Sequence, residues 1–289
     1  PAVQANRKTL EERGVRILGP EHGSQACGET GAGRMLEPDQ IAAAVCDVGL
    51  ITAGEGLLQG KTVVVTAGPT REPIDPVRYI TNRSSGKMGY AIATAVARQG
   101  ATVIVVSGPV SIDAPSGVTV KRVTTAEEMY NATHALIGDA DIFIAAAAVS
   151  DYRPAEARAH KMKKDARSMS IELVKCPDIL ASVAALKNAP FTVGFAAETE
   201  NVRDYALGKL RNKKLNMIVA NRVGDDCGFD FDENAVDVYW AEGERAFAKS
   251  TKTELAHEIV KLVAARYEQT RGVAAQPGLA IISSNRKKS

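Results

Sequence analysis

The feature that most constrains this chain is a repeated alternation of short β-branched runs with amphipathic helical segments between residues 61 and 267. Residues 62–66 (TVVVT) favour a buried strand, since the run is short, β-branched and flanked by glycines. Residues 86–99 favour a helix, with apolar residues at helical spacing and Gly100 as its stop. Further strands are predicted at 102–107, 118–123, 141–149, 191–196, 217–220 and 236–240. Further helices are predicted after the capping box Thr125-x-x-Glu128, from Pro177, over 202–213, and from Thr251 to Tyr267.

This order of elements predicts an α/β fold. Strands that alternate with helices form a Rossmann-like, doubly wound, mostly parallel sheet with helices on both faces. Ligands of such sheets bind beyond the carboxyl ends of the strands, where the strand order reverses. We therefore expect the site among the segments that follow Thr66, Ser107, Val149, Ala196 and Ala220.

Composition and charge exclude several classes of protein. Lysine and arginine number 36 against 34 acidic residues, a net charge of +2, so no basic face for nucleic acid is expected. The longest apolar run, residues 142–149, is far shorter than the ~20 residues of a membrane span. No secretory leader opens the chain, which starts at Pro1, so we expect a processed or truncated N-terminus.

The cysteines and histidines are scattered along the chain. Cys27, Cys46, Cys176 and Cys227 form no C-x-x-C pair, which argues against a zinc ribbon or a disulfide scaffold and fits a reducing cytoplasm. The four histidines are equally dispersed, so no dedicated metal cage is expected.

A long insertion separates the first strand from its helix. The helix mouth, residues 84–89 (SSGKMG), offers hydroxyls, free N–H groups and a positive dipole end that suit a phosphate. Packing of small residues at a capped helix start explains the same pattern equally well. The insertion carries Arg71, Glu72, Asp75, Arg78 and Asn82, which suit either a solvated loop or recognition of an anionic substrate.

The fourth strand ends in small residues followed by Asp151, which allow a flat ring to approach or simply cap a polar turn. Residues 153–168 are polar and resemble a mobile flap, and lysines there either close over a triphosphate or are merely solvated. Phe195 suits stacking on a base or packing in the core. Lys209 and Lys213 share a helix face, which costs some stability unless an anion lies between them.

Several long motifs, in order, closely resemble bacterial phosphopantothenoylcysteine synthetase, the C-terminal half of a bifunctional coenzyme A biosynthesis flavoprotein. They are residues 68–89 (GPTREPIDPVRYITNRSSGKMG), 145–153 (AAAAVSDYR), 161–164 (KMKK), 177–178 (PD) and 194–198 (GFAAE). The resemblance implies a ligase domain over residues 60–270, followed by a flexible tail over 271–289.

Residues 26–35 (ACGETGAGRM) resemble the substrate clamp of the other half, a flavin-dependent decarboxylase. By this resemblance residues 1–59 are the C-terminal remnant of the decarboxylase domain, and Cys27 matches its proton donor. Glu29 stands where the family has aspartate. The flavin-binding part is missing, so FMN is expected only in the full-length bifunctional protein and no decarboxylation is expected from this chain alone.

The resemblance implies that CTP activates 4′-phosphopantothenate as an acyl-cytidylate, releasing pyrophosphate, and that the amine of L-cysteine then displaces CMP. Arg78, Asn82 and Lys161 match catalytic positions, with Lys161 on the flap. Magnesium is expected on the triphosphate, held mainly by phosphate oxygens and water. The CTP site is implied at Ser84, Ala145, Ala146, Ala147, Asp151, Lys161, Pro177, Asp178, Ile179, Leu180, Phe195, Lys209 and Lys213.

The resemblance also implies a homodimer of the ligase domain, with a flap that closes across the subunit interface, and a larger assembly when the decarboxylase half is present. No nucleic acid or membrane partner is expected. Two other functions are alternatives for this fold: a nicotinamide oxidoreductase and a nucleotide-binding assembly module without turnover. The first turn lacks G-x-G-x-x-G, which argues against the oxidoreductase.

Overall fold

The computed structural model describes residues 2–13, 15, 17–24, 30–36, 41, 56–162, 169–198, 200–222 and 233–274. The chain divides into two compact units, Pro1–Gly54 and Glu55–Ser289. The first unit contains helix α1 (Ala2–Glu12) and an antiparallel pair of strands, β1 (Glu21–Ser24) and β2 (Thr30–Arg34). Within these ranges, no helix has both the length and the apolar character needed to cross a membrane.

An eight-stranded sheet forms the centre of the second unit, in the order β14-β13-β12-β11-β8-β3-β6-β7. Each pair of neighbouring strands from β12 to β7 in this order is parallel, whereas the pairs β12–β13 and β13–β14 are antiparallel. The predicted α/β fold with a mostly parallel sheet is therefore confirmed. The strands are β3 (Thr62–Ala67), β6 (Thr102–Ser107), β7 (Val118–Arg122), β8 (Ile142–Ala145), β11 (Phe191–Glu198), β12 (Met217–Arg222), β13 (Glu233–Trp240) and β14 (Gly243–Thr251).

The strand order reverses between β3 and β8. From β3 the chain moves outward to β6 and β7, then returns to β8 on the other side of β3. A parallel sheet opens a crevice at the carboxyl ends of the two strands that flank such a reversal. The crevice is therefore expected beside Ala67 and Ala145, where these two strands end.

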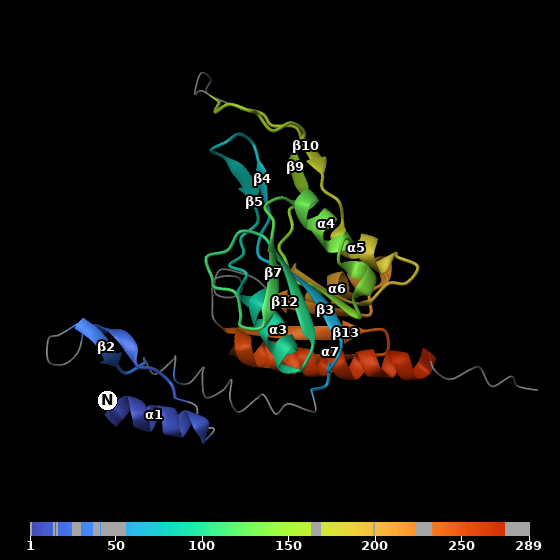
Figure 1. Ribbon diagram of the computed structural model, residues 1–289. Coiled ribbons are helices and arrows are strands. Elements are labelled where there is room, and N and C mark those ends of the chain that lie inside the picture. Colours follow the sequence, from blue (N-terminus) through green and yellow to red (C-terminus); the bar gives the residue numbers. More distant parts are fainter. Residues whose placement is uncertain are drawn as a thin grey trace, which may run out of the picture. The chain divides into compact units, whose positions relative to one another are not determined.

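Helices cover both faces of this sheet, as Figure 1 shows. Helices α3 (Lys87–Arg98) and α7 (Lys252–Ala274) pack on one face, over a core that includes Val63 and Val65. Helices α4 (Ala126–His134), α5 (Ile179–Ala184) and α6 (Val202–Asn212) cover the other face, where Val64 is buried. The alternation of valines between the two cores follows from the two-residue period of a strand. A 3-10 turn, η1 (Ile137–Asp139), leads into β8.

The predicted capping box of α4 is confirmed. The Thr125 hydroxyl accepts the N–H of Glu128, and the Glu128 carboxylate accepts the N–H of Thr125. Buried Glu72 adds a further cap from the insertion, because its carboxylate accepts the N–H of Ala126 at 2.9 Å. Glu72 is therefore part of the packed structure and not a solvated loop residue.

Two hairpins were not predicted. One joins β4 (Arg71–Pro73) to β5 (Tyr79–Thr81) inside the insertion, and the other joins β9 (Tyr152–Pro154) to β10 (Leu173–Lys175). Both hairpins lie at the same end of the sheet (Figure 1), and β4 contacts β9. The strands are three residues long and lack an alternating pattern, so local sequence gives no signal for them.

Several predicted bounds need correction, and one further strand was not predicted. The regular strand predicted over 141–149 ends at Ala145. Residues 146–148 bond instead to the end of β3 and to the residues after it, through Ala146 N–H to Thr66 O and Ala148 N–H to Gly68 O. Strand β13 begins at Glu233, three residues before the predicted start. Strand β14 was missed altogether, since it is exposed and polar along much of its length. Helix α7 runs to Ala274, so the first residues of the predicted tail are helical, and residues 275–289 lie outside the described residues.

A candidate nucleotide and acyl-substrate site of two joined cavities

Two cavities open at the strand reversal and share one wall. The helix-mouth cavity, of about 470 Å³, lies between the start of α3 and the ends of β11 and β12. The α5 cavity, of about 620 Å³, lies between the end of β8 and the start of α5. Both volumes fall in the usual range of small-molecule sites. The residues that line both cavities are Ala147, Val149, Asp151 and Phe195.

The two cavities contain most of the predicted nucleotide residues. Those in the helix-mouth cavity are Ser84, Ala146, Ala147, Asp151, Phe195 and Lys209. Those in the α5 cavity are Ala145, Ala147, Asp151, Pro177, Asp178, Ile179, Leu180, Phe195 and Lys213. Five segments that are distant in the sequence thus meet at the carboxyl ends of the strands, where the site was expected.

The helix mouth combines an anion-suited dipole end with tight packing. Gly86 is the N-cap of α3 at φ 78°, a left-handed conformation that favours glycine, and no side chain caps the helix there. The Ser84 hydroxyl accepts the Gly86 N–H at 3.3 Å. Gly89 packs against β3, where an added Cβ would lie 2.6 Å from the Cβ of Ala67. The glycines therefore serve packing, and residues 84–89, at the start of α3, line the helix-mouth cavity.

Asn82 lies beside the shared wall. Its amide nitrogen donates to the carbonyl of Val149 at 2.9 Å, which fixes the side chain beside the segment that follows β8. The insertion contacts this segment a second time through Thr70, whose hydroxyl accepts the N–H of Ser150 at 3.0 Å. An amide held in this way can contact a group that spans the two cavities.

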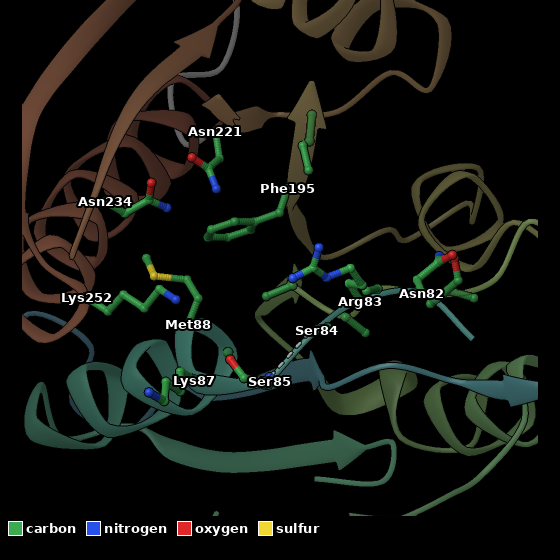
Figure 2. A pocket seen from close by; sticks show the side chains of 18 of the residues that line it. Asn82, Arg83, Ser84, Ser85, Lys87, Met88, Phe195, Asn221, Asn234 and Lys252 are labelled. Carbon is green, nitrogen blue, oxygen red and sulfur yellow. Dashed lines mark hydrogen bonds between the residues drawn. The ribbon is translucent and has the colours of Figure 1, made fainter. Parts of the chain in front are cut away.

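Phe195 separates the two cavities. Its side chain is partly buried against the core on the α3 side of the sheet, and Figure 2 shows the ring directed into the helix-mouth cavity. Ala145, Ala146 and Ala147 supply a wall without bulky side chains in these two cavities. A flat aromatic ring of a ligand can therefore lie against this wall, although the ring of Phe195 also contributes to packing.

Lys209 and Lys213 each have a carboxylate partner of their own, which offsets the repulsion expected from two lysines on one helix face. Lys209 pairs with Glu198 at 2.6 Å and lines the helix-mouth cavity, whereas Lys213 pairs with Asp178 at 2.7 Å and lines the α5 cavity. The two ammonium groups thus diverge to different cavities. Each salt bridge is partly exposed, so a triphosphate can compete for the lysine.

Asp178 is the N-cap of α5 and accepts the N–H of Ala181 at 3.0 Å. Partial burial acts to raise the pKa of Asp178, but the hydrogen bonds from Lys213 and Ala181 outweigh it and lower the pKa below its ordinary value. Asp178 is therefore a carboxylate near neutral pH, and it holds both the helix start and Lys213 at the edge of the α5 cavity.

Arg78 and Lys161 lie away from both cavities. The Arg78 guanidinium donates to buried Asp75 and to the carbonyl of Met162 at 3.0 Å, and the Met162 N–H donates to Asp75 at 3.2 Å. The Arg78 hydrogen bond and the backbone N–H groups hold the pKa of Asp75 well below its usual range, against the effect of burial. This cluster ties the segment that carries Lys161 to the insertion, so of the two alternatives for the insertion the solvated loop does not apply to Asp75. The catalytic roles of Arg78 and Lys161 stay predictions.

Three polar residues of the helix-mouth cavity were not predicted: Asn221 on β12, Asn234 on β13 and Lys252 at the start of α7. Figure 2 places them on one side of Phe195, with Asn82 on the other. Asn221 directly follows Ala220, one of the strand ends after which the site was expected, although no single residue was named there. Asn234 and Lys252 come from an antiparallel strand and a late helix, for which no such rule exists.

Some of the predicted residues are not among those that the structure describes. Cys27 and Glu29 of the clamp, and Lys163 and Lys164 of the flap, lie outside the described residues. Among the residues that are described, no group of three or more His, Cys, Asp or Glu side chains could hold a metal ion. Asp151, on the shared wall, is a carboxylate that could join a magnesium ion held mainly by phosphates.

Comparison with known proteins gives one family. The family described as DNA/pantothenate metabolism flavoprotein C-terminal domain matches residues 58–267. The chain is 51% identical over 266 residues to the coenzyme A biosynthesis bifunctional protein CoaBC of Vibrio vulnificus. The aligned region covers 91% of this chain but only 65% of the length of that relative.

Solved structures of similar fold include a domain of a CoaBC protein and a Cab2 mutant. The C-terminal domain of a bifunctional CoaBC protein, 43% identical, covers 74% of this chain and all of that domain with a TM-score of 0.64. A Cab2 mutant in complex with phosphopantothenate-cysteine, 16% identical with a TM-score of 0.61, covers 83% of this chain and 97% of that one and shares its fold.

Proposed function

Because this chain belongs to the family of DNA/pantothenate metabolism flavoprotein C-terminal domains, we propose that it is a CTP-dependent phosphopantothenate–cysteine ligase of coenzyme A biosynthesis. The reaction joins the carboxylate of 4′-phosphopantothenate to the amine of L-cysteine through an acyl-cytidylate. The products are 4′-phosphopantothenoylcysteine, CMP and pyrophosphate. We also propose that residues 1–59 are the C-terminal end of a decarboxylase half. A cytoplasmic location is part of the same proposal.

The observation that carries the proposal is the wall common to the two cavities. A reaction between a nucleotide and a phosphorylated acid needs two adjacent sites whose reacting ends meet. The helix-mouth cavity and the α5 cavity meet over Ala147, Val149, Asp151 and Phe195. Asn82 is bonded to Val149 at this junction, where the acyl-cytidylate would form and then break.

The α5 cavity suits the nucleotide. Its small-residue wall suits the flat cytosine, with Phe195 on the wall that both cavities share, while Lys213, and Lys209 across the junction, suit the phosphates. Magnesium would neutralise the triphosphate, with Asp151 as the carboxylate on the junction wall. The lysines would exchange Asp178 and Glu198 for phosphate oxygens as the nucleotide binds.

The helix-mouth cavity then suits the phosphorylated acid. The start of α3 presents N–H groups and a positive dipole end to its phosphate. The carboxylate would lie at the junction, where it attacks the α-phosphorus of CTP and displaces pyrophosphate. In the second step the cysteine amine attacks the acyl carbon and releases CMP, so the atoms and charges balance without a redox partner.

A homodimer is part of the proposal. The hairpins β4–β5 and β9–β10 expose large apolar side chains, among them Tyr79, Tyr152 and Leu173, each more than two-fifths exposed. Apolar groups gathered at one end of the sheet favour a protein interface. A second copy of the chain would cover them and bring a second flap segment near the junction.

The test follows nucleotides by mass spectrometry. The full chain is incubated with CTP, magnesium and 4′-phosphopantothenate, with and without L-cysteine. CMP that appears only with cysteine, together with the amide product, supports the ligase and its order of steps. CTP that stays intact under every condition refutes it and leaves a nucleotide-binding module without turnover.

Asn82→Asp tests the junction. We expect pyrophosphate release to continue while conversion to product falls by at least tenfold, since a carboxylate cannot donate to the carbonyl of Val149 or to the acyl oxygen. Asn131→Asp, the same chemical change at an exposed position of α4, is the matched control and should turn over normally. Normal product formation by Asn82→Asp would remove Asn82 from the reaction.

A further inference from the structure

Lys252 is a buried cation in the wall of the helix-mouth cavity. It is 8% exposed, and no other lysine or arginine among the residues whose burial the structure describes is buried to this extent. Figure 2 shows its side chain extending toward Met88, in the first turn of α3. A buried ammonium group is costly for a fold unless anions or hydrogen-bond acceptors lie close to it.

The helix-mouth cavity gathers positive charge around Lys252. Lys252 is the first residue of α7, and the start of α3 lines the same cavity. The N-terminal end of a helix carries a partial positive charge, so a cation is disfavoured there and an anion is favoured. Among the described residues that line the cavity, Asp151 is the one acidic side chain, and the basic ones are Arg83, Lys87, Lys209 and Lys252. Each of these basic side chains also has an interaction within the chain, which a bound anion would join or replace.

The helix-mouth cavity adjoins a different cavity at each of its ends. At one end it shares the junction wall with the α5 cavity, where Asn82 is bonded to Val149. At the other end, Lys87 and Lys252 also line a third cavity, of about 440 Å³, between α3 and the start of α7. Figure 2 agrees, because Lys252 and Asn82 lie on opposite sides of Phe195. A ligand that spans the cavity from the junction therefore ends beside Lys252.

We propose that Lys252 binds the phosphate of the acyl substrate and thereby selects 4′-phosphopantothenate over pantothenate. This inference rests on the proposed function, in which the carboxylate reacts at the junction and the phosphate lies at the start of α3. The carboxylate and the phosphate are the two ends of 4′-phosphopantothenate, so a molecule that reacts beside Asn82 extends its phosphate toward Lys252. The phosphate there meets the Lys252 ammonium group and the starts of α3 and α7.

Burial is the reason why Lys252, and not Lys87, has the larger part in this selection. Lys87 lies at the same end of the cavity but is only half-buried. Water and salt screen the attraction between charges less at a buried site than at an exposed one. Pantothenate carries a hydroxyl in place of the phosphate ester, so it offers no negative charge to the buried ammonium group. The predicted consequence is a preference for the phosphorylated acid that depends on the charge of Lys252.

The experiment compares binding of 4′-phosphopantothenate and pantothenate by titration calorimetry, in the presence of a non-hydrolysable CTP analogue. Lys252→Met removes the charge from a side chain of similar length. We expect it to weaken binding of 4′-phosphopantothenate at least about tenfold and binding of pantothenate less than about twofold. Its KM for CTP should stay within about twofold of the native value, since the phosphates of CTP bind at the other end of the site. Lys252→Arg, which keeps the charge, should bind 4′-phosphopantothenate more tightly than Lys252→Met does.

Lys261→Met is the matched control, because it removes the same charge from an exposed position of α7, where Lys261 pairs with Glu258. It should keep the native preference for the phosphorylated acid. An unchanged preference in Lys252→Met, or an equal loss of affinity for both compounds, would overturn the inference, since an equal loss indicates a packing role. If Lys252→Met does not fold, Lys252→Gln, which stays polar, makes the same comparison. A chain that consumes CTP normally while its Lys252 variants keep the native preference refutes only this inference, whereas a chain that never consumes CTP refutes the proposed function.

Discussion

Gly89→Ala tests whether the helix mouth is held by direct contact between α3 and β3. Gly89 is buried in the first turn of α3, and an added Cβ would lie 2.6 Å from the Cβ of Ala67 and 3.1 Å from its Cα. Neither atom can rotate away, since one is a methyl carbon on a buried strand and the other is backbone. The helix would therefore have to move from the strand by several tenths of an ångström.

The size of the effect follows from two opposing contributions. Overpacking of a close-packed core costs about 1–3 kcal/mol, whereas alanine in a helix is favoured over glycine by at most ~1 kcal/mol. We expect Gly89→Ala to lower the free energy of unfolding by about 0–2 kcal/mol. Gly208→Ala in α6 is the matched control, because no heavy atom lies within 4 Å of its added Cβ. It should raise the free energy of unfolding by about 0.5–1 kcal/mol.

Urea unfolding followed by tryptophan fluorescence measures the free energy of unfolding of each variant. Trp240, the one tryptophan of the chain, lies on β13 and so reports on the sheet that carries α3. The two variants should differ by about 1–3 kcal/mol, the overpacking cost alone. Gly89→Ala should also raise the KM for 4′-phosphopantothenate, because the helix mouth moves with the helix. If Gly89→Ala is as stable as Gly208→Ala, the contact between α3 and β3 does not limit the position of the helix mouth.

Three further predictions concern single residues. Phe195→Ala should weaken CTP binding by ~1–3 kcal/mol in a calorimetric titration if the ring stacks on the base, and unchanged binding would restrict Phe195 to packing. Asp75, whose pKa is lowered in the folded chain by Arg78, contributes stability above the ordinary carboxyl pKa of about 4 and loses it as the pH falls. The difference in free energy of unfolding between the native chain and Asp75→Asn should therefore decrease as the pH falls below ~4. The same difference for Asp113→Asn, an exposed control, should not show this decrease. A difference for Asp75→Asn that does not depend on pH would contradict the lowered pKa of Asp75. Burial, with the charges of Glu72 and Asp151, raises the pKa of Cys176 to about 11, so iodoacetamide at pH ~8 should alkylate Cys176 roughly 100-fold more slowly than the unfolded chain, as measured by peptide mass spectrometry. Equal rates in the folded and unfolded chains would show that the thiol is not shielded.

Local sequence determined most of the regular structure that carries the site. The run of β-branched residues at 62–66, the capping box at Thr125 and the glycine at the end of α3 each act within a few residues, so the strands and helices could be predicted from them. The rule for parallel sheets then located the ligand segments after Thr66, Val149 and Ala196. Local signals failed where strands are short or polar, as in the two hairpins and in β14.

Tertiary structure decided which side chains meet. Asp75 accepts the N–H of Met162 from 87 residues away, and Glu72 caps α4 from 54 residues away, so residues that suit a solvated loop become buried anchors. The same holds for Lys209 and Lys213, which share a helix face but have separate carboxylate partners, Glu198 on β11 and Asp178 at the start of α5. Asn221, Asn234 and Lys252 form one wall only because an antiparallel strand and the last helix close the sheet edge. Sequence by itself determined the elements and the family, because propensities and motifs are local. The pairing of charges and the junction of the two cavities depend on contacts between distant segments, which only the folded chain specifies.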